Sequence, residues 1–167
     1  MRVYNSYSDV MFTPWKLRRV VKELSVRLPA LMEEYDFDTI AVSGKSGFAV
    51  AFALSMVMDI KVVAVRKGES SHGDMVEGPG DHAFTRYAFF DDFISSGSTM
   101  KRVHAELENY ASKRPGTETP ECVLCIEYQG YASASGFGHR EPIGGIKRYR
   151  IADPSLLPGG IWEFDNE

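Results

Sequence analysis

Apolar residues follow a helical spacing in some stretches of the chain and form short continuous runs in others. Thr13 and Pro14 are typical of a helix start, and the apolar residues after them recur at helical spacing, which predicts a first helix of about five turns. Residues 48–58 are apolar nearly all round, as in a helix packed against a sheet, and residues 98–112 carry one apolar face. Short apolar runs predict strands at residues 38–43, 61–66, 86–90, 121–128 and 147–152.

The predicted elements follow the order helix, strand, helix, strand, loop, strand, helix, strand. This alternation predicts an α/β fold with a doubly wound, mostly parallel sheet that is flanked by helices. Residues 67–85 hold four glycines and little apolar periodicity, which predicts a long mobile loop, and residues 129–146 allow no assignment. Because such sheets bind ligands at the carboxyl ends of their strands, candidate chemistry is expected there.

Composition and charge narrow the class of protein. The 167 residues are 44% apolar and 25% charged, which is ordinary for one globular domain. A net charge of −4 provides no global positive field, so neither nucleic acid nor a membrane surface is expected as a partner. The N-terminus lacks the pattern of a signal peptide, and no apolar stretch approaches the length of a bilayer. We therefore expect a single cytoplasmic domain that covers residues 1–167.

The two cysteines, Cys122 and Cys125, have the C-x-x-C spacing of some metal and redox sites. Both fall in a predicted strand, where residues three apart point to opposite faces of the sheet. A zinc site would also need a second ligand pair, and no His or Cys is spaced to supply one. The favoured interpretation is a pair of buried structural thiols.

The strand at residues 86–90 runs directly into two adjacent acids, Asp91 and Asp92, and then into a loop that opens a helix. The start of a helix exposes unpaired N–H groups and can hold a phosphate. Hydroxyl groups can add donors, and a glycine lets the backbone approach the phosphate oxygens closely. The loop residues are Ser95, Ser96, Gly97, Ser98 and Thr99. Because the two acids would repel a phosphate, they must face hydrogen-bond donors such as sugar hydroxyls.

This segment resembles the signature of the type I phosphoribosyltransferases: apolar residues, two acids, two further residues, and a T-T-G-G-T-like loop. The match runs from Phe90 to Thr99, with Ser exchanges. The resemblance implies that Asp91 and Asp92 bind the ribose hydroxyls of 5-phosphoribosyl-1-pyrophosphate (PRPP), and that residues 95–99 bind its 5-phosphate. The alternative is an acid pair that only ends a strand. The resemblance covers a core of about residues 13–128, with a small hood expected from residues 1–12, residues 129–167 or both.

Two weaker matches precede this segment in the order that the family requires. The first, expected to be the pyrophosphate loop, consists of Ser43, Gly44, Lys45, Ser46 and Gly47. A simple turn is the alternative for this loop, and its spacing is not that of a Walker A motif. The second match is Arg66 and Lys67, which could neutralise the departing pyrophosphate or could be an ordinary solvated pair. His72 and His82, in the loop that follows, are further candidate ligand contacts.

The resemblance implies transfer of the 5-phosphoribosyl group from PRPP to a nitrogen of a base, with a nucleobase as the expected acceptor and with release of pyrophosphate. Asp91, Asp92 and Lys67 would be the catalytic residues. The cofactor would be Mg²⁺, held mainly by PRPP oxygens with the two acids nearby. Ser95 stands where some purine-salvage members carry an acid, which makes a hypoxanthine or guanine acceptor less favoured. The aromatic candidates for stacking on the base are Tyr128, Tyr131, Phe137 and Trp162.

Two other interpretations remain open. A PRPP- or nucleotide-binding regulatory protein of the same fold would retain the binding site without catalysis. An unrelated doubly wound nucleotide-binding module is disfavoured, because no G-x-G-x-x-G follows the first strand. The expected partners are small molecules, and because dimers are common in the family, a homodimer is among the expected assemblies.

Overall fold

The computed structural model describes residues 9–68, 75–79, 84–128 and 138–151. Its helices are α1 (Asp9–Phe12), α2 (Pro14–Tyr35), α3 (Lys45–Ser55) and α4 (Ser98–Ser112). Its strands are β1 (Thr39–Val42), β2 (Lys61–Val65), β3 (Val76–Glu77), β4 (Arg86–Asp91), β5 (Glu121–Glu127), β6 (Gly138–Ile143) and β7 (Ile146–Arg150).

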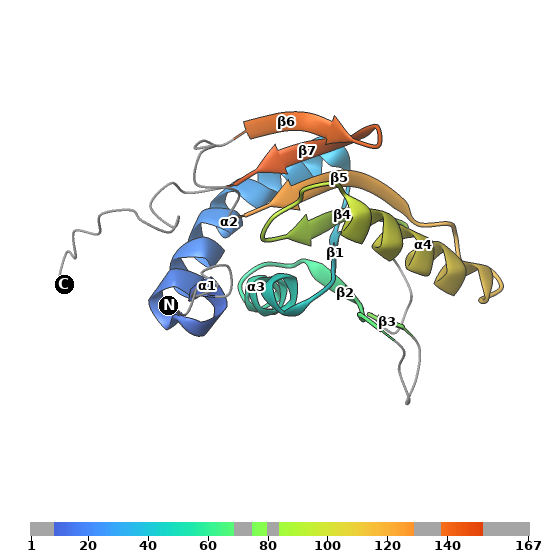
Figure 1. Cartoon of the computed structure of the whole chain (residues 1–167), viewed down its shortest axis with the longest axis horizontal. Coiled ribbons are helices and arrows are strands. Elements are labelled where there is room, and N and C mark those ends of the chain that lie inside the picture. The colour runs from blue at the N-terminus through green and yellow to red at the C-terminus, as the bar shows by residue number, and fades with distance from the viewer. Residues whose placement is uncertain (1–8, 69–74, 80–83, 129–137, 152–167) are drawn as a thin grey trace, which may run out of the picture.

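The strands form one seven-stranded sheet in the order β3-β2-β1-β4-β5-β7-β6 (Figure 1). The five inner strands are parallel, and the two edge strands, β3 and β6, run antiparallel to their neighbours. The predicted α/β fold with a mostly parallel sheet is therefore confirmed. Within the described residues, none of the helices combines the length and apolar character needed to cross a membrane.

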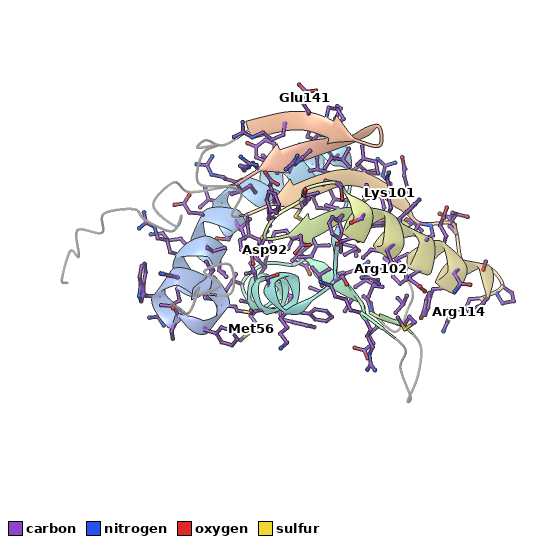
Figure 2. The ribbon with its side chains drawn as sticks, viewed as in Figure 1. Met56, Asp92, Lys101, Arg102, Arg114 and Glu141 are labelled. Carbon is purple, nitrogen blue, oxygen red and sulfur yellow. The ribbon has the colours of Figure 1, made fainter. Side chains whose placement is uncertain are left out.

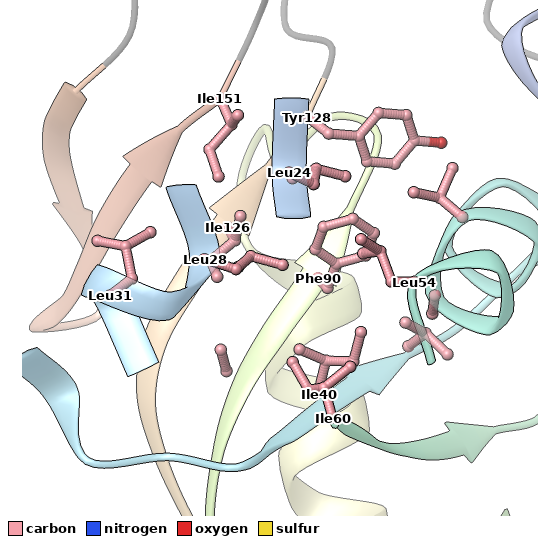
Figure 3. Close-up of a cluster of buried hydrophobic side chains, with 14 of the residues drawn as sticks. Leu24, Leu28, Leu31, Ile40, Leu54, Ile60, Phe90, Ile126, Tyr128 and Ile151 are labelled. Carbon is pink, nitrogen blue, oxygen red and sulfur yellow. The ribbon is translucent and has the colours of Figure 1, made fainter. Parts of the chain in front are cut away.

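Helices cover both faces of the sheet, as the doubly wound prediction requires. One core cluster joins α2 and α3 to the sheet through residues such as Leu24, Leu28 and Leu54 (Figure 3). The second cluster lies on the opposite face, where Met100, Val103 and Leu107 of α4 are buried. Successive strand residues alternate between the two clusters: Phe89 belongs to the second and Phe90 to the first.

Several element boundaries differ from the prediction. Helix α2 has 22 residues, about one turn more than expected. Helix α3 was predicted over residues 48–58. It begins at Lys45, inside the expected glycine-containing loop, and ends at Ser55. Within residues 67–85, β3 pairs with β2, so part of the expected loop is a short edge strand. Strand β6 falls in the segment that allowed no assignment, and β6 and β7 extend the sheet beyond β5. Both strands lie within residues 129–167, one of the ranges expected for the hood.

The orientation predicted for the two cysteines is wrong. Tyr87 pairs with Cys122 but Ala88 pairs with Leu124, so Val123 is an extra residue in the β5 ladder. This bulge turns Cys122 and Cys125 to the same face, where both are buried in the core beneath α4. A hydrogen bond from the Cys125 thiol is the main cause that lowers the pKa of Cys122. Both thiols are free, as the interpretation of structural cysteines expects.

Candidate functional site

The carboxyl ends of the central strands bring the candidate residues to one edge of the sheet. Strand β1 pairs in parallel with β2 on one side and β4 on the other, so Val42 stands opposite both Ala64 and Phe90. The residues that follow these three positions therefore meet at one edge, although up to 48 positions separate them in the chain (43 to 91). Because α3 covers one face of the sheet and α4 covers the other, the loops after β1 and β4 diverge at this point and leave space for a ligand.

The predicted phosphate-binding residues enclose a hollow at the start of α4. The hollow has a volume of about 110 Å³ and is called the phosphate cup below. Gly97 is the residue before the helix and has a left-handed conformation, with φ of 73°. Ser96 Oγ lies 3.2 Å from Ser98 Oγ, so the loop hydroxyls are mutually oriented. The cup is lined by Phe89, Asp91, Phe93, Ile94, Ser95, Ser96, Gly97, Ser98, Thr99 and Met100.

The two acids lie beside the cup in different environments. Asp91 is only 8% exposed, and its Oδ1 accepts the backbone N–H of Asp92 at 3.0 Å. Burial, followed by the charge of Asp92, raises the pKa of Asp91 to about 7. Asp92 is less buried and accepts the N–H of Phe93 at 2.9 Å; it is labelled in Figure 2. A ligand that donates hydrogen bonds to Asp91 would favour its charged form.

Lys67 lies between the two candidate loops. A Cβ atom placed on Gly44 would be 2.9 Å from Lys67 Nζ, so the ammonium group lies directly against the Gly44 backbone. The same ammonium group lowers the pKa of Asp91, in opposition to burial. Gly44 itself has φ of 90°, a conformation that favours glycine. The structure thus brings Lys67, Gly44 and Asp91 together.

The expected pyrophosphate loop is only partly a loop. Lys45, Ser46 and Gly47 form the first turn of α3, and Ser43 and Gly44 alone precede the helix. The position of these residues in the first turn of α3 matters chemically, because a helix start offers its free N–H groups to an anion. Gly47 permits close packing on the sheet, since a Cβ atom there would lie 3.2 Å from the carbonyl oxygen of Phe90.

The hydroxyl group of Ser43 forms its hydrogen bonds within the protein. It donates to the carbonyl oxygen of Val65 at 2.8 Å and accepts from Arg102 Nη2 at 2.5 Å. Arg102, on α4, also donates to the carbonyl oxygen of Arg66 at 3.0 Å. Arg102, labelled in Figure 2, therefore ties the ends of β1 and β2 to α4. Sequence reasoning missed this residue, because an arginine on a helix gives no sign of partners 36 and 59 positions away.

The structure describes two of the remaining candidates, Arg66 and Tyr128. Arg66 forms a salt bridge with Glu77 of β3, which holds it at the sheet edge. Tyr128 is only 1% exposed: its ring stacks on Phe90 and its hydroxyl group bonds to Ser46, so in this structure it is a core residue and not a surface for a base. The other candidates, His72, His82, Tyr131, Phe137 and Trp162, lie outside the described residues.

Sequence reasoning also missed a buried cluster of charges behind the cup. Glu127 ends β5 and is fully buried, and Arg148 and Arg150 of β7 pair with its carboxylate. The only sign in the sequence is an acid at the end of an apolar strand. The described residues hold no group of three or more His, Cys, Asp or Glu side chains that could bind a metal ion.

Comparison with known proteins bears on the fold of the chain. No protein-family model matches the chain, and no curated protein matches it in sequence. Solved structures do match. UMP synthase from Leishmania donovani superposes with a TM-score of 0.60 and 18% identity over 87% of this chain, which spans 29% of that protein. Orotate phosphoribosyltransferase from Mycobacterium tuberculosis, solved with PRPP, gives 0.57 and 15% over 90% of this chain and 81% of that one.

Adenine phosphoribosyltransferase from Thermoanaerobacter pseudethanolicus is a third such structure, with a TM-score of 0.55 and 17% identity over 86% of this chain and 83% of that one. At these identities the likeness establishes the fold and not the activity. The chain therefore has the fold of the type I phosphoribosyltransferases. The predicted resemblance to this family is therefore confirmed at the level of the fold, and the roles of residues 90–99 stay a prediction.

Proposed function

We propose that this protein is a phosphoribosyltransferase that moves the 5-phosphoribosyl group from PRPP to a nitrogen of a nucleobase. The observation that carries the proposal is the position of Asp91 in the wall of the phosphate cup, with Asp92 next to it in the chain and Lys67 near both Asp91 and Gly44. The site thus offers acceptors for sugar hydroxyls, donors for a phosphate and a cation for a second anionic group. PRPP carries these three features within one molecule.

Each part of the site has a proposed task. The cup would hold the 5-phosphate through the N–H groups at the start of α4 and the serine and threonine hydroxyls. Asp91 and Asp92 would accept hydrogen bonds from the ribose hydroxyls and so fix the sugar. Lys67 and the N–H groups at the start of α3 would neutralise the pyrophosphate as it leaves. Catalysis would then come from alignment and charge stabilisation, without a covalent step on the protein.

The residues of the site also fit a magnesium ion. Mg²⁺ binds through one or two carboxylates together with substrate phosphates, and it retains water molecules. Asp91 and Asp92 supply two carboxylates at the edge of the cup. When bound with PRPP, the ion would add positive charge near the pyrophosphate.

The test has two stages. Calorimetry with magnesium and PRPP should show binding, and the Asp91→Asn/Asp92→Asn double variant should lose it. Asp59→Asn, an exposed acid after α3, is the matched control and should bind as the wild type does. A panel of bases is then added and pyrophosphate release is followed. Release with one base supports the enzyme, and absence of PRPP binding to the wild type contradicts the proposal.

A second candidate function is a regulatory protein that binds PRPP or a nucleotide without turnover. It is favoured by one observation: Tyr128, the one candidate for stacking on a base within the described residues, is buried. Ser95 also stands where an acid would act on a purine ring. Tight PRPP binding without pyrophosphate release from any base in the panel would select this function. For the enzyme, we propose that a hood drawn from residues 1–12, residues 129–167 or both presents the base.

We also propose that the protein forms a homodimer through the face made by α1–α3. The described residues include six large apolar side chains that are notably exposed, and all belong to residues 12–57. Met56, labelled in Figure 2, is 86% exposed and lines an apolar groove of about 480 Å³ between α2 and α3. Apolar patches of this kind mark interaction surfaces. Light scattering should find a dimer, and Met56→Glu should shift it toward the monomer; a monomeric wild type would contradict this proposal.

A further inference from the structure

Three charged side chains are packed together where β5 meets β7. Glu127 is 0% exposed, and Arg150 is 5% exposed. Arg148 Nη2 lies 2.6 Å from Glu127 Oε2, and Arg150 Nε bonds to the other carboxylate oxygen. Buried charges are costly unless they are paired and hydrogen-bonded. Removal of one charged partner is therefore expected to displace the backbone groups that the cluster contacts.

The cluster contacts the wall of the phosphate cup at Ile94. The backbone N–H of Ile94 donates to Glu127 Oε2 at 3.2 Å, and its carbonyl oxygen accepts from Arg148 Nη2 at 2.6 Å. Both polar groups of this residue are thus held by charged side chains from other strands. Because Ile94 lines the cup and directly precedes Ser95, its position affects where the hydroxyl-rich part of the cup lies.

The hairpin of β6 and β7 contacts the cup at a second point. A Cβ atom on Gly97 would lie only 2.3 Å from Ile143 Cγ2, so the Ile143 side chain presses on the Gly97 backbone. The β6–β7 turn follows Ile143, and a Cβ atom on its Gly144 would lie 3.8 Å from the Lys101 side chain. The hairpin therefore supports the cup at Ile94 through charge and at Gly97 through packing.

The charge of the cluster complements a deficit in the cup. Among the residues that line the cup, none is Lys or Arg, and Asp91 brings negative charge. The cluster holds two arginines and one glutamate, so it has one more positive than negative charge. Because it is buried against Ile94, this charge is poorly screened by solvent. It would favour a phosphate dianion in the cup.

We propose that Glu127, Arg148 and Arg150 are positioning residues that hold the phosphate cup in its binding shape and supply positive charge behind it. This inference rests on the proposed function, because the ligand is the 5-phosphate of a phosphoribosyl group. The three side chains act through Ile94 and do not touch the ligand. A cluster that only joined β7 to the sheet would stabilise the fold without preference for one ligand over another.

Two fragments of PRPP, called part-ligands below, distinguish a positioning role from a purely structural one. Ribose 5-phosphate tests the cup and the acid pair, whereas magnesium pyrophosphate tests Gly44, the start of α3 and Lys67. The variant of choice is Arg148→Met, because it leaves Glu127 paired with Arg150 and leaves no buried charge alone. Loss of a hydrogen bond to a charged group is expected to weaken ribose 5-phosphate binding by about 10- to 100-fold. The dissociation constant for magnesium pyrophosphate should remain that of the wild type.

Two further variants complete the experiment. Arg148→Lys keeps the charge but not the forked geometry, so it should recover part of the affinity for ribose 5-phosphate. It also carries the test if Arg148→Met does not fold. Arg114→Met is the matched control: Arg114 is also partly buried and donates to a backbone carbonyl, that of Tyr110, but at the far end of α4 (Figure 2). This control should bind both part-ligands as the wild type does.

The outcomes distinguish failure of this inference from failure of the proposed function. If the wild type binds ribose 5-phosphate and Arg148→Met binds it equally well, the positioning role is wrong and the proposed function stands. Equal loss of both part-ligands would mean that the cluster is only structural. If the wild type binds no ribose 5-phosphate, both the proposed function and the positioning role are wrong.

Discussion

Replacement of Asp91 by asparagine should stabilise the folded protein above neutral pH while it removes PRPP binding. In the folded protein the pKa of Asp91 is raised from 3.8 to about 7, chiefly because burial disfavours the charged form. The unfolded chain has the ordinary value. At a pH between these two pKa values, Asp91 holds a proton in the folded state that it has lost in the unfolded state. This group therefore makes the free energy of unfolding fall as pH rises.

The size of the effect follows from the two pKa values. The difference corresponds to a cost to folding of about 4 kcal/mol once pH exceeds 7, and of about 0.6 kcal/mol at pH 4. Asparagine has no such cost and can still accept the N–H of Asp92. For a chain of this length, about 4 kcal/mol raises the melting temperature by roughly 8–16 °C. This is an upper limit, because Asp91 and Asp92 titrate as a pair.

The assay is urea unfolding of the wild type and of Asp91→Asn at pH 4, 6 and 8. The free energy of unfolding of the variant should exceed that of the wild type by an amount that grows with pH across this window. Asp59→Asn, on the surface, should stay within about 0.5 kcal/mol of the wild type at each pH. A gain that is the same at pH 4 and pH 8 would refute the reasoning, and so would a less stable variant at pH 8.

Three further results are expected. Gly97→Ala should lower the free energy of unfolding by about 2 kcal/mol or more, because the φ of Gly97 is 73° and the new Cβ atom would collide with Ile143. In urea unfolding, the double variant Gly97→Ala/Ile143→Ala should recover part of this loss. No recovery would contradict the contact. Lys67→Met should raise the pKa of Asp91 further in a carboxyl NMR titration, because the ammonium group of Lys67 lowers that pKa in the wild type. The same variant should weaken the binding of magnesium pyrophosphate. An unchanged titration of Asp91 would exclude the interaction with Lys67. Cys122 and Cys125 should react with a thiol reagent only after unfolding, because both are buried; fast reaction of the native protein would contradict the packing beneath α4.

The local features of this protein could be predicted from the sequence. Period and composition over short windows determine whether a segment becomes a helix or a buried strand, and α2, β1, β2, β4, α4 and β5 were all found in this way. The strand end that carries the acid pair, and the loop and helix start that follow it, were predicted for the same reason, whereas their roles in binding rest on the family resemblance and stay a prediction. Asp91 and Thr99 are separated by one strand end and one loop, so their proximity follows from the local chain path alone.

Only the tertiary structure decided the contacts between distant segments. The partners of Ser43 and of Glu127 depend on strand order and register, which no short window encodes. One extra residue in β5 was enough to reverse the predicted relation of Cys122 to Cys125, because side chains alternate along a strand and a single insertion changes the face. The start of α3 moved into the predicted loop because Gly47 lets the helix pack closely against Val42 and Phe90. Such contacts arise when the sheet assembles, and they decide which side chains remain available to a ligand.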